Sequence, residues 1–136
     1  DHTVRLWKVS DGTLVANLEG HTGDVFSMAF LPQQTMMVAG SSDGNIYLWD
    51  IINVTVQRIL GGHTGAVHSL VITADGELLF SGSVDNTVRV WRISSGAPIS
   101  SLKNTGNVNS LAISPNGALL AMGSEDGVLR LWGTSP

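Results

Sequence analysis

Four tryptophans divide the chain at nearly equal intervals, and they constrain its fold more than any other feature. Trp7, Trp49, Trp91 and Trp132 are 42, 42 and 41 residues apart. Each closes a similar phrase: DHTVRLW, DGNIYLW, DNTVRVW and DGVLRLW. A fixed period of about 40 residues is the signature of a structure built from repeated copies of one small unit. The chain is therefore expected to fold as an array.

Other residue types keep fixed distances from the tryptophans. An aspartate precedes each tryptophan by six residues, at Asp1, Asp43, Asp85 and Asp126. A valine precedes each of the last three by 24 residues, and four residues before that valine stand His21, His63 and Asn104. Several residue types thus recur together at the same offsets, and the asparagine marks the last unit as the divergent one.

Within each unit the apolar residues follow a short rhythm that is typical of strands rather than helices. The second unit reads VHSLVI, ELLFSGS, TVRVW and PISSL, separated by the turn sequences TADG, VDN and SSG. Short β-forming runs bounded by turn residues indicate strands. The sequence therefore predicts an all-β fold of four-stranded antiparallel sheets, with no helix longer than a turn or two.

Composition narrows the class of protein. Hydrophobic residues make up 43% of the 136 residues and charged residues 13%, which fits a densely packed all-β protein. The chain has no cysteine and hence no disulfide, which fits an intracellular location. It also has no apolar run of about 18 residues, so we expect no membrane span.

The charge pattern argues against nucleic-acid binding by this segment. The net charge is −4, whereas a phosphate-binding surface needs clustered Lys and Arg. Arg5, Arg89 and Arg130 each stand two residues before a tryptophan. We interpret them as a solvated strand face whose side-chain stems cover apolar surface.

With these features together, the chain resembles the WD-repeat β-propeller family. The resemblance rests on GHTGDV, GGHTGAV, SGSVDNTVRVW and the dipeptide Trp49-Asp50, and it covers nearly the whole chain. It implies four-stranded blades packed radially around a central channel, each with strands a to d from the channel outward. It also implies an interaction platform rather than an enzyme.

Blade boundaries follow from this resemblance. Residues 1–19 would supply strands c and d of one blade, residues 24–61 and 66–103 two whole blades, and residues 107–133 strands a, b and c of a further blade. Propellers have roughly four to eight blades, whereas this length supplies only about three. We therefore expect an incomplete ring, a fragment whose partners include the remaining blades of its own propeller.

The resemblance gives the recurring polar residues a structural role. In the family a Trp, a Ser or Thr, a His and an Asp form a hydrogen-bonded chain in the blade, because a buried indole N–H is costly unless it is paired. One unit carries all four types, as His63, Ser81, Asp85 and Trp91. Ala39 replaces the hydroxyl one unit earlier and Met122 one unit later. The incomplete networks contain His21, Asp43, Trp49, Asp126, Trp132, Asp1 and Trp7. We expect all four tryptophans to be buried.

His63, Ser81 and Asp85 are also the residue types of a hydrolase triad. A triad requires an exposed nucleophile, an oxyanion hole and a substrate cleft. Here the types recur at the period of the repeat, which favours one structural network per blade over a catalytic site. No cofactor or metal site is therefore expected.

Partner-binding residues are expected on loops that gather on one face of the blades. The candidates precede a network aspartate or lie near the start of strand a, and they are Asp24, Phe26, Ser42, Ala66, His68, Val84, Asn107, Asn109 and Glu125. Phe26 is either an aromatic anchor for a partner peptide or a residue that packs against the next blade. His68 is expected to be a surface residue rather than a metal ligand, because no second histidine or carboxylate accompanies it in the repeat.

Three classes of function remain. The favoured one is a noncatalytic scaffold that binds partner peptides or domains within an intracellular complex. The alternative is a substrate-recruiting subunit of an enzyme complex, such as a ubiquitin ligase receptor. Catalysis on the propeller itself would need a non-repeating cluster of titratable residues on one face, and the sequence shows none.

Overall fold

Thirteen β-strands and no helix make up the part of the chain that the computed structural model describes, residues 1–32 and 34–133. The strands form four antiparallel sheets of two, four, four and three strands. The prediction of an all-β fold with an incomplete series of four-stranded sheets is confirmed. Accordingly, none of the described residues lies in a helix that could cross a membrane.

The four sheets follow the chain in order, and each contains only strands that are consecutive in sequence. Sheet I consists of β1 (Val4–Trp7) and β2 (Leu14–Leu18). Sheet II consists of β3 (Val25–Phe30), β4 (Met36–Ser41), β5 (Ile46–Asp50) and β6 (Thr55–Leu60). Sheet III consists of β7 (Val67–Ile72), β8 (Leu78–Ser83), β9 (Thr87–Arg92) and β10 (Ala97–Lys103). Sheet IV consists of β11 (Val108–Ile113), β12 (Leu119–Ser124) and β13 (Leu129–Gly133).

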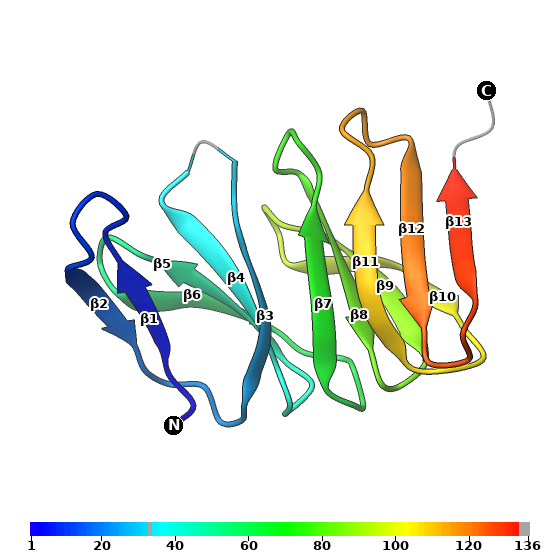
Figure 1. Cartoon of the computed structure of the whole chain (residues 1–136), viewed down its shortest axis with the longest axis horizontal. Helices are drawn as coiled ribbons and strands as arrows, with labels where there is room; N and C mark the ends of the chain where they lie inside the picture. Colours follow the sequence, from blue (N-terminus) through cyan, green and yellow to red (C-terminus); the bar gives the residue numbers. More distant parts are fainter. Residues whose placement is uncertain (33, 134–136) are drawn as a thin grey trace.

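The sheets stand side by side, with sheet I at one end of the molecule and sheet IV at the other (Figure 1). The first strands of sheets II, III and IV, namely β3, β7 and β11, are neighbours in space although about one repeat separates them in sequence. This arrangement brings equivalent residues of successive sheets together. It also places the loops of each sheet at one of two opposite ends.

The hydrophobic core lies between neighbouring sheets rather than within any one of them. Three clusters of buried residues fill the joints between sheets I and II, II and III, and III and IV. In the first joint Trp49 and Tyr47 of sheet II pack with Val4 and Leu18 of sheet I. Each sheet therefore depends on its neighbour to bury its apolar face.

A glycine in the second strand of one sheet lets a valine of the next sheet approach closely. A Cβ placed on Gly40 would lie only 2.8 Å from Cγ1 of Val67, and a Cβ on Gly82 only 2.5 Å from Cγ1 of Val108. Both valines are fully buried. The recurring valines of the sequence are thus the residues that lock one sheet against the previous one.

Serines form a second repeated link between the sheets. The backbone N–H of Leu70 on β7 donates to Oγ of Ser27 on β3, at 3.1 Å. The backbone N–H of Leu111 on β11 donates in the same way to Oγ of Ser69 on β7, at 2.9 Å. Because β7 and β11 are the first strands of their sheets, this bond occupies an edge N–H that no strand pairs with.

The tight turn between the second and third strands requires one residue with positive φ. Gly44 and Gly127 occupy that position in sheets II and IV, with φ of 83° and 77°, and Asn86 occupies it in sheet III with φ of 65°. Glycine and asparagine are the residues that tolerate this conformation best. The turn holds the network aspartate, which directly precedes this residue, at a fixed place.

Candidate functional site

In sheet III the four polar residues form one continuous hydrogen-bonded chain. Trp91 on β9 donates its indole N–H to Oγ of Ser81 on β8, at 2.8 Å. Ser81 Oγ lies 2.7 Å from Nε2 of His63, and Nδ1 of His63 lies 2.8 Å from Oδ2 of Asp85. The chain therefore ties two strands to the loop before β7 and to the turn after β8.

The protonation of this chain follows from its surroundings. Burial lowers the pKa of His63 and outweighs the opposing effect of the neighbouring Asp85. Burial by itself would raise the pKa of Asp85, but hydrogen bonds from Thr87 and His63 outweigh it and hold this pKa below its ordinary value. At neutral pH a neutral imidazole therefore accepts the Ser81 hydroxyl hydrogen at Nε2 and donates from Nδ1 to the carboxylate.

Ser81 cannot serve as a nucleophile in this arrangement. Its side chain is completely buried, and its oxygen accepts the Trp91 hydrogen while its own hydrogen points to His63. A nucleophile must be open to a substrate. Among the described residues, moreover, no group of three His, Cys, Asp or Glu side chains is placed to hold a metal ion.

Sheet II has a shorter chain, because Ala39 stands where the serine would be. Trp49 donates its indole N–H directly to Nε2 of His21, at 3.1 Å. The neutral imidazole then carries its hydrogen on Nδ1, and this buried atom has no hydrogen-bond partner. Burial also lowers the pKa of His21. The histidine is therefore separated from the aspartate of its own sheet.

Asp43, the aspartate of sheet II, is held by other side chains. Its Oδ2 accepts the hydroxyl hydrogens of Tyr47, at 2.6 Å, and of Thr22. Burial would raise the pKa of Asp43, but the hydrogen bonds from Thr22 and Tyr47 outweigh it and lower the pKa to about 2. A tyrosine thus replaces histidine as the partner of the turn carboxylate.

In sheet IV an arginine takes this place. Nη2 of Arg130 lies 2.9 Å from Oδ2 of Asp126 and 3.0 Å from Oγ1 of Thr105. Hydrogen bonds from Arg130 and then Thr105 hold the pKa of Asp126 far below its ordinary value. Asn104 donates from Nδ2 to Oγ of Ser124 and to the carbonyl oxygen of Gly106, both at 2.7 Å. Asn104 therefore braces its own loop instead of binding the aspartate.

Sheet I repeats the arginine arrangement, since Arg5 forms an ion pair with Asp1. The expectation of a buried tryptophan in every unit does not hold here, because Trp7 is 56% exposed. It lies on β1, which has a partner strand on one side only. Trp132 is half-buried, whereas Trp49 and Trp91 are almost fully buried.

One position that the sequence interpretation missed supplies a partner of the turn aspartate in three of the four sheets. The residue four positions after the aspartate is Arg5, Tyr47, Arg89 or Arg130. Three of these bind the aspartate, and only Arg89, whose sheet has the complete histidine chain, lies elsewhere, against Gly62. The interpretation of these arginines as solvated agrees with Arg5, whose side chain is 50% exposed, but it is wrong for Arg89, whose Nε is buried. The constant spacing of four residues between the aspartate and this position is the sequence signal that could have predicted the contact.

Six of the candidate partner-binding residues are joined in equivalent pairs. The backbone N–H of Ser42 donates to the carbonyl of Asp24 at 2.8 Å, Val84 likewise to Ala66 at 3.1 Å, and Glu125 to Asn107 at 3.0 Å. Each bond connects the loop that enters a sheet to the turn between its second and third strands. We call this end of the sheets, along the lower edge in Figure 1, the paired-loop face.

The other three candidates are the second residues of β3, β7 and β11: Phe26, His68 and Asn109. The rings of Phe26 and His68 meet edge to face with their centroids 4.7 Å apart. Phe26 nevertheless stays 51% exposed, and Asn109 is exposed as well. The phenylalanine therefore both contacts the next sheet and presents a ring to solvent.

A comparison of the sequence with known protein families agrees with the repeated sheets described above. A family model described as WD domain, G-beta repeat fits residues 12–50, 54–92 and 96–133. The chain belongs to the WD40 family. A comparison with curated proteins found no match.

Each WD40 match is out of phase with the sheets. The match over residues 12–50 contains β2 of sheet I and then β3, β4 and β5 of sheet II, and the other two matches run in the same way. Each WD40 repeat therefore spans two sheets and carries the loop between them. WD40 repeats generally mediate contacts between proteins, which directs attention to exposed loops rather than to the buried networks.

Proposed function

We propose that this chain is a noncatalytic scaffold that binds partner proteins at its paired-loop face. The observation that carries the proposal is the ring of Phe26, which rests against His68 and is still half open to solvent. An aromatic side chain that is fixed by a neighbour suits the centre of an interface, because binding costs it little further ordering. The burial of Ser81 supports a role without catalysis.

The paired loops give this surface its breadth. Bonds of the same kind hold Asp24 to Ser42, Ala66 to Val84, and Asn107 to Glu125. A peptide or domain that covers Phe26 therefore meets loops of several sheets that are already held in place. We further propose an intracellular complex as the setting, supported by the absence of cysteine from the chain.

The test compares two phenylalanines on one strand. Phe26 and Phe30 lie at opposite ends of β3 and are 51% and 62% exposed, so Phe30→Ala is a matched control for Phe26→Ala. After affinity purification from cells with quantitative mass spectrometry, Phe26→Ala is expected to reduce specific partners about tenfold. Phe30→Ala is expected to keep them. A folded Phe26→Ala variant with an unchanged partner set would contradict the proposal.

The finer alternative is a subunit that recruits a substrate to an enzyme, such as a ubiquitin ligase receptor. It differs from a plain scaffold in one measurable respect. A recruiter copurifies with catalytic subunits, and Phe26→Ala would then reduce modification of the bound protein as well as its binding. Partners without any associated enzyme would favour the scaffold.

A further inference from the structure

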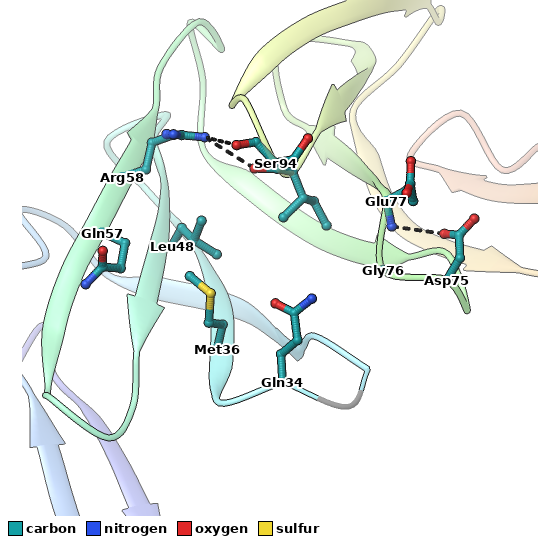
Figure 2. Close-up of a pocket in the computed structure, with 10 residues that line it drawn as sticks. Gln34, Met36, Leu48, Gln57, Arg58, Asp75, Gly76, Glu77 and Ser94 are labelled. Atoms are coloured by element: carbon teal, nitrogen blue, oxygen red, sulfur yellow. Dashed lines mark hydrogen bonds between the residues drawn. The ribbon is translucent and has the colours of Figure 1, made fainter.

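A groove between sheets II and III opens away from the paired-loop face. Figure 2 shows its walls, which come from strands β4 to β6, the loop between β7 and β8, and the loop after β9. Its volume is about 380 Å³. Ligand-binding clefts typically fall in the range of roughly 300 to 1,000 Å³.

The floor of the groove is apolar, whereas its rim is polar. Leu48 and Ile93 are buried among the residues of the joint between sheets II and III, and Met36 packs against them from its place on β4. Such a surface favours the aliphatic part of a visiting side chain, because covering it removes apolar area from water.

Two carboxylates border one side of the groove, in the loop between β7 and β8 (Figure 2). Oδ1 of Asp75 accepts hydrogen bonds from Oγ1 of Thr73 at 2.5 Å and from the backbone N–H of Glu77 at 2.9 Å. These bonds lower the pKa of Asp75 and keep it ionised at neutral pH. Glu77 lies 3.7 Å from Arg92 with both side chains more than half exposed, so this weak ion pair can exchange for another.

Arg58, the cation on the opposite side of the groove, already has hydrogen-bond partners within the protein. Nη1 of Arg58 on β6 donates to the carbonyl oxygens of Ile93, at 3.3 Å, and Ser94, at 3.1 Å, which joins sheet II to sheet III. Gly96 makes room for the arginine, since a Cβ there would collide with its side chain. The carboxylates are therefore the groups of the groove that remain available to a charged ligand.

These charges are absent from the equivalent joint between sheets III and IV. Arg58 pairs with Leu48 across sheet II, and the residue that pairs with the equivalent Val90 in sheet III is Ser100. Asp75 and Glu77 correspond to Asn116 and Ala118 in the matching turn of sheet IV. The repeat thus forms this joint without carboxylates, so the packing of the sheets does not require them.

We propose that this groove binds an arginine side chain of an extended partner peptide. The aliphatic stem lies over Met36 and Leu48, and the guanidinium pairs with Asp75 and Glu77. Arginine fits better than lysine because its planar fork bonds carboxylates at two points and because it is less strongly hydrated. The site is independent of the paired-loop face, so either proposal can fail without the other.

The test is an NMR titration of the whole chain with two blocked peptides. One peptide is acetyl-Gly-Gly-Arg-Gly-Gly-amide, and the other carries citrulline, the uncharged analogue, in place of arginine. We expect the arginine peptide to shift the amide signals of Glu77, Ile93 and Ser94, and citrulline to bind about tenfold more weakly. Raising the salt concentration should weaken the binding of the arginine peptide but not that of the citrulline peptide.

Charge reversal tests the location. Glu77→Lys is expected to weaken binding of the arginine peptide about tenfold, whereas Glu19→Lys, the same change at an exposed residue after β2 that belongs to neither proposed surface, leaves it unchanged. Unchanged tryptophan fluorescence of both variants establishes that they are folded. Equal binding of the two peptides, shifts confined to the paired-loop face, or full affinity in folded Glu77→Lys would each overturn the proposal.

Discussion

Trp49 donates its indole hydrogen directly to His21, and the centroids of the two rings lie 5.3 Å apart. In sheet III the equivalent rings of Trp91 and His63 lie 6.3 Å apart, with Ser81 between them. In sheet II, where alanine stands in place of the serine, the tryptophan and histidine rings thus lie closer together than in sheet III. The closer contact satisfies the indole but leaves Nδ1 of His21 without a partner.

Removing the central hydroxyl of the complete chain is expected to destabilise the protein. In Ser81→Ala the buried Trp91 N–H and His63 Nε2 both lose their partner, because their rings lie 6.3 Å apart and not at the closer spacing of sheet II; the loss costs about 1 to 3 kcal/mol of unfolding free energy. Urea denaturation followed by tryptophan fluorescence measures the loss. Ser100→Ala, an exposed serine of the same sheet, is the control and should change little. Equal stability of both variants would show that the hydrogen-bonded chain of sheet III does not contribute to the stability of the protein.

Acidification is expected to weaken the fold first through its buried histidines. Burial lowers the folded pKa of His21 and His63 below the ordinary value of 6.5. Below pH 6.5 the unfolded state therefore binds protons that the folded state does not, and stability falls as the pH falls. Denaturation curves between pH 7.5 and about 5 measure the slope. A flat profile in wild type, or an unchanged slope after replacing both histidines by glutamine, would contradict this origin.

A second acid-sensitive step is expected from Asp43. Its pKa of about 2 lies below the ordinary 3.8, so its stabilisation is complete above pH 3.8 and is lost as the pH falls toward 2. Tyr47→Phe removes one bond to this carboxylate and should cost about 1 kcal/mol at pH 7, a modest value because solvent screens the group.

The difference between Tyr47→Phe and wild type should shrink below pH 3.8. NMR titration of the carboxyl groups should show a raised pKa for Asp43, with Asp11, which bonds to Thr13 in the turn between β1 and β2, as an internal control. A variant whose deficit stays constant down to pH 2 would rule out this pairing.

A methyl group at Gly82 is expected to push sheets III and IV apart. The new Cβ of Gly82→Ala would lie 2.5 Å from Val108 Cγ1, and overpacking of this kind costs about 1 to 3 kcal/mol. Gly123 is the equivalent residue of sheet IV, and a Cβ there would lie 3.6 Å from Ser110. Gly123→Ala should therefore keep or slightly raise the melting temperature, and equal losses in both variants would refute the close-contact argument.

Loss of the serine link is expected to expose one particular amide. In Ser69→Ala the backbone N–H of Leu111 has no acceptor, so its hydrogen exchange should accelerate roughly fivefold, for about 1 kcal/mol. Ser110→Ala is the matched control, because Ser110 is the exposed equivalent in sheet IV. Unchanged exchange at Leu111 would mean that the bond contributes nothing to local stability.

Sequence periodicity could predict the sheets because the residues that make them recur at one spacing. The valines mark the first strand, the aspartates the turn, and the tryptophans the third strand. Each of these elements can be located from the local sequence pattern alone. The structure agrees with this order in sheets II and III, from Val25 to Leu60 and from Val67 to Lys103.

The partners of the polar side chains were harder to predict, because they depend on small departures from the repeat. Tyr47 and Arg130 occupy the same position, yet one gives Asp43 a hydroxyl and the other gives Asp126 a guanidinium. The exposure of Trp7 likewise depends on what packs beside β1, which its own phrase does not encode. The serine link was missed although Ser27 and Ser69 are in register, because its donor lies one sheet away.

The glycine and valine contacts give the array a direction. The joint between sheets II and III and the joint between sheets III and IV both bring the second strand of one unit against the first strand of the next, so in each of them two unlike surfaces meet. A unit of this kind fits a copy of itself. Duplication of a stretch of 42 residues would carry both halves of the joint with it, so such arrays can lengthen by copying without evolving a new interface.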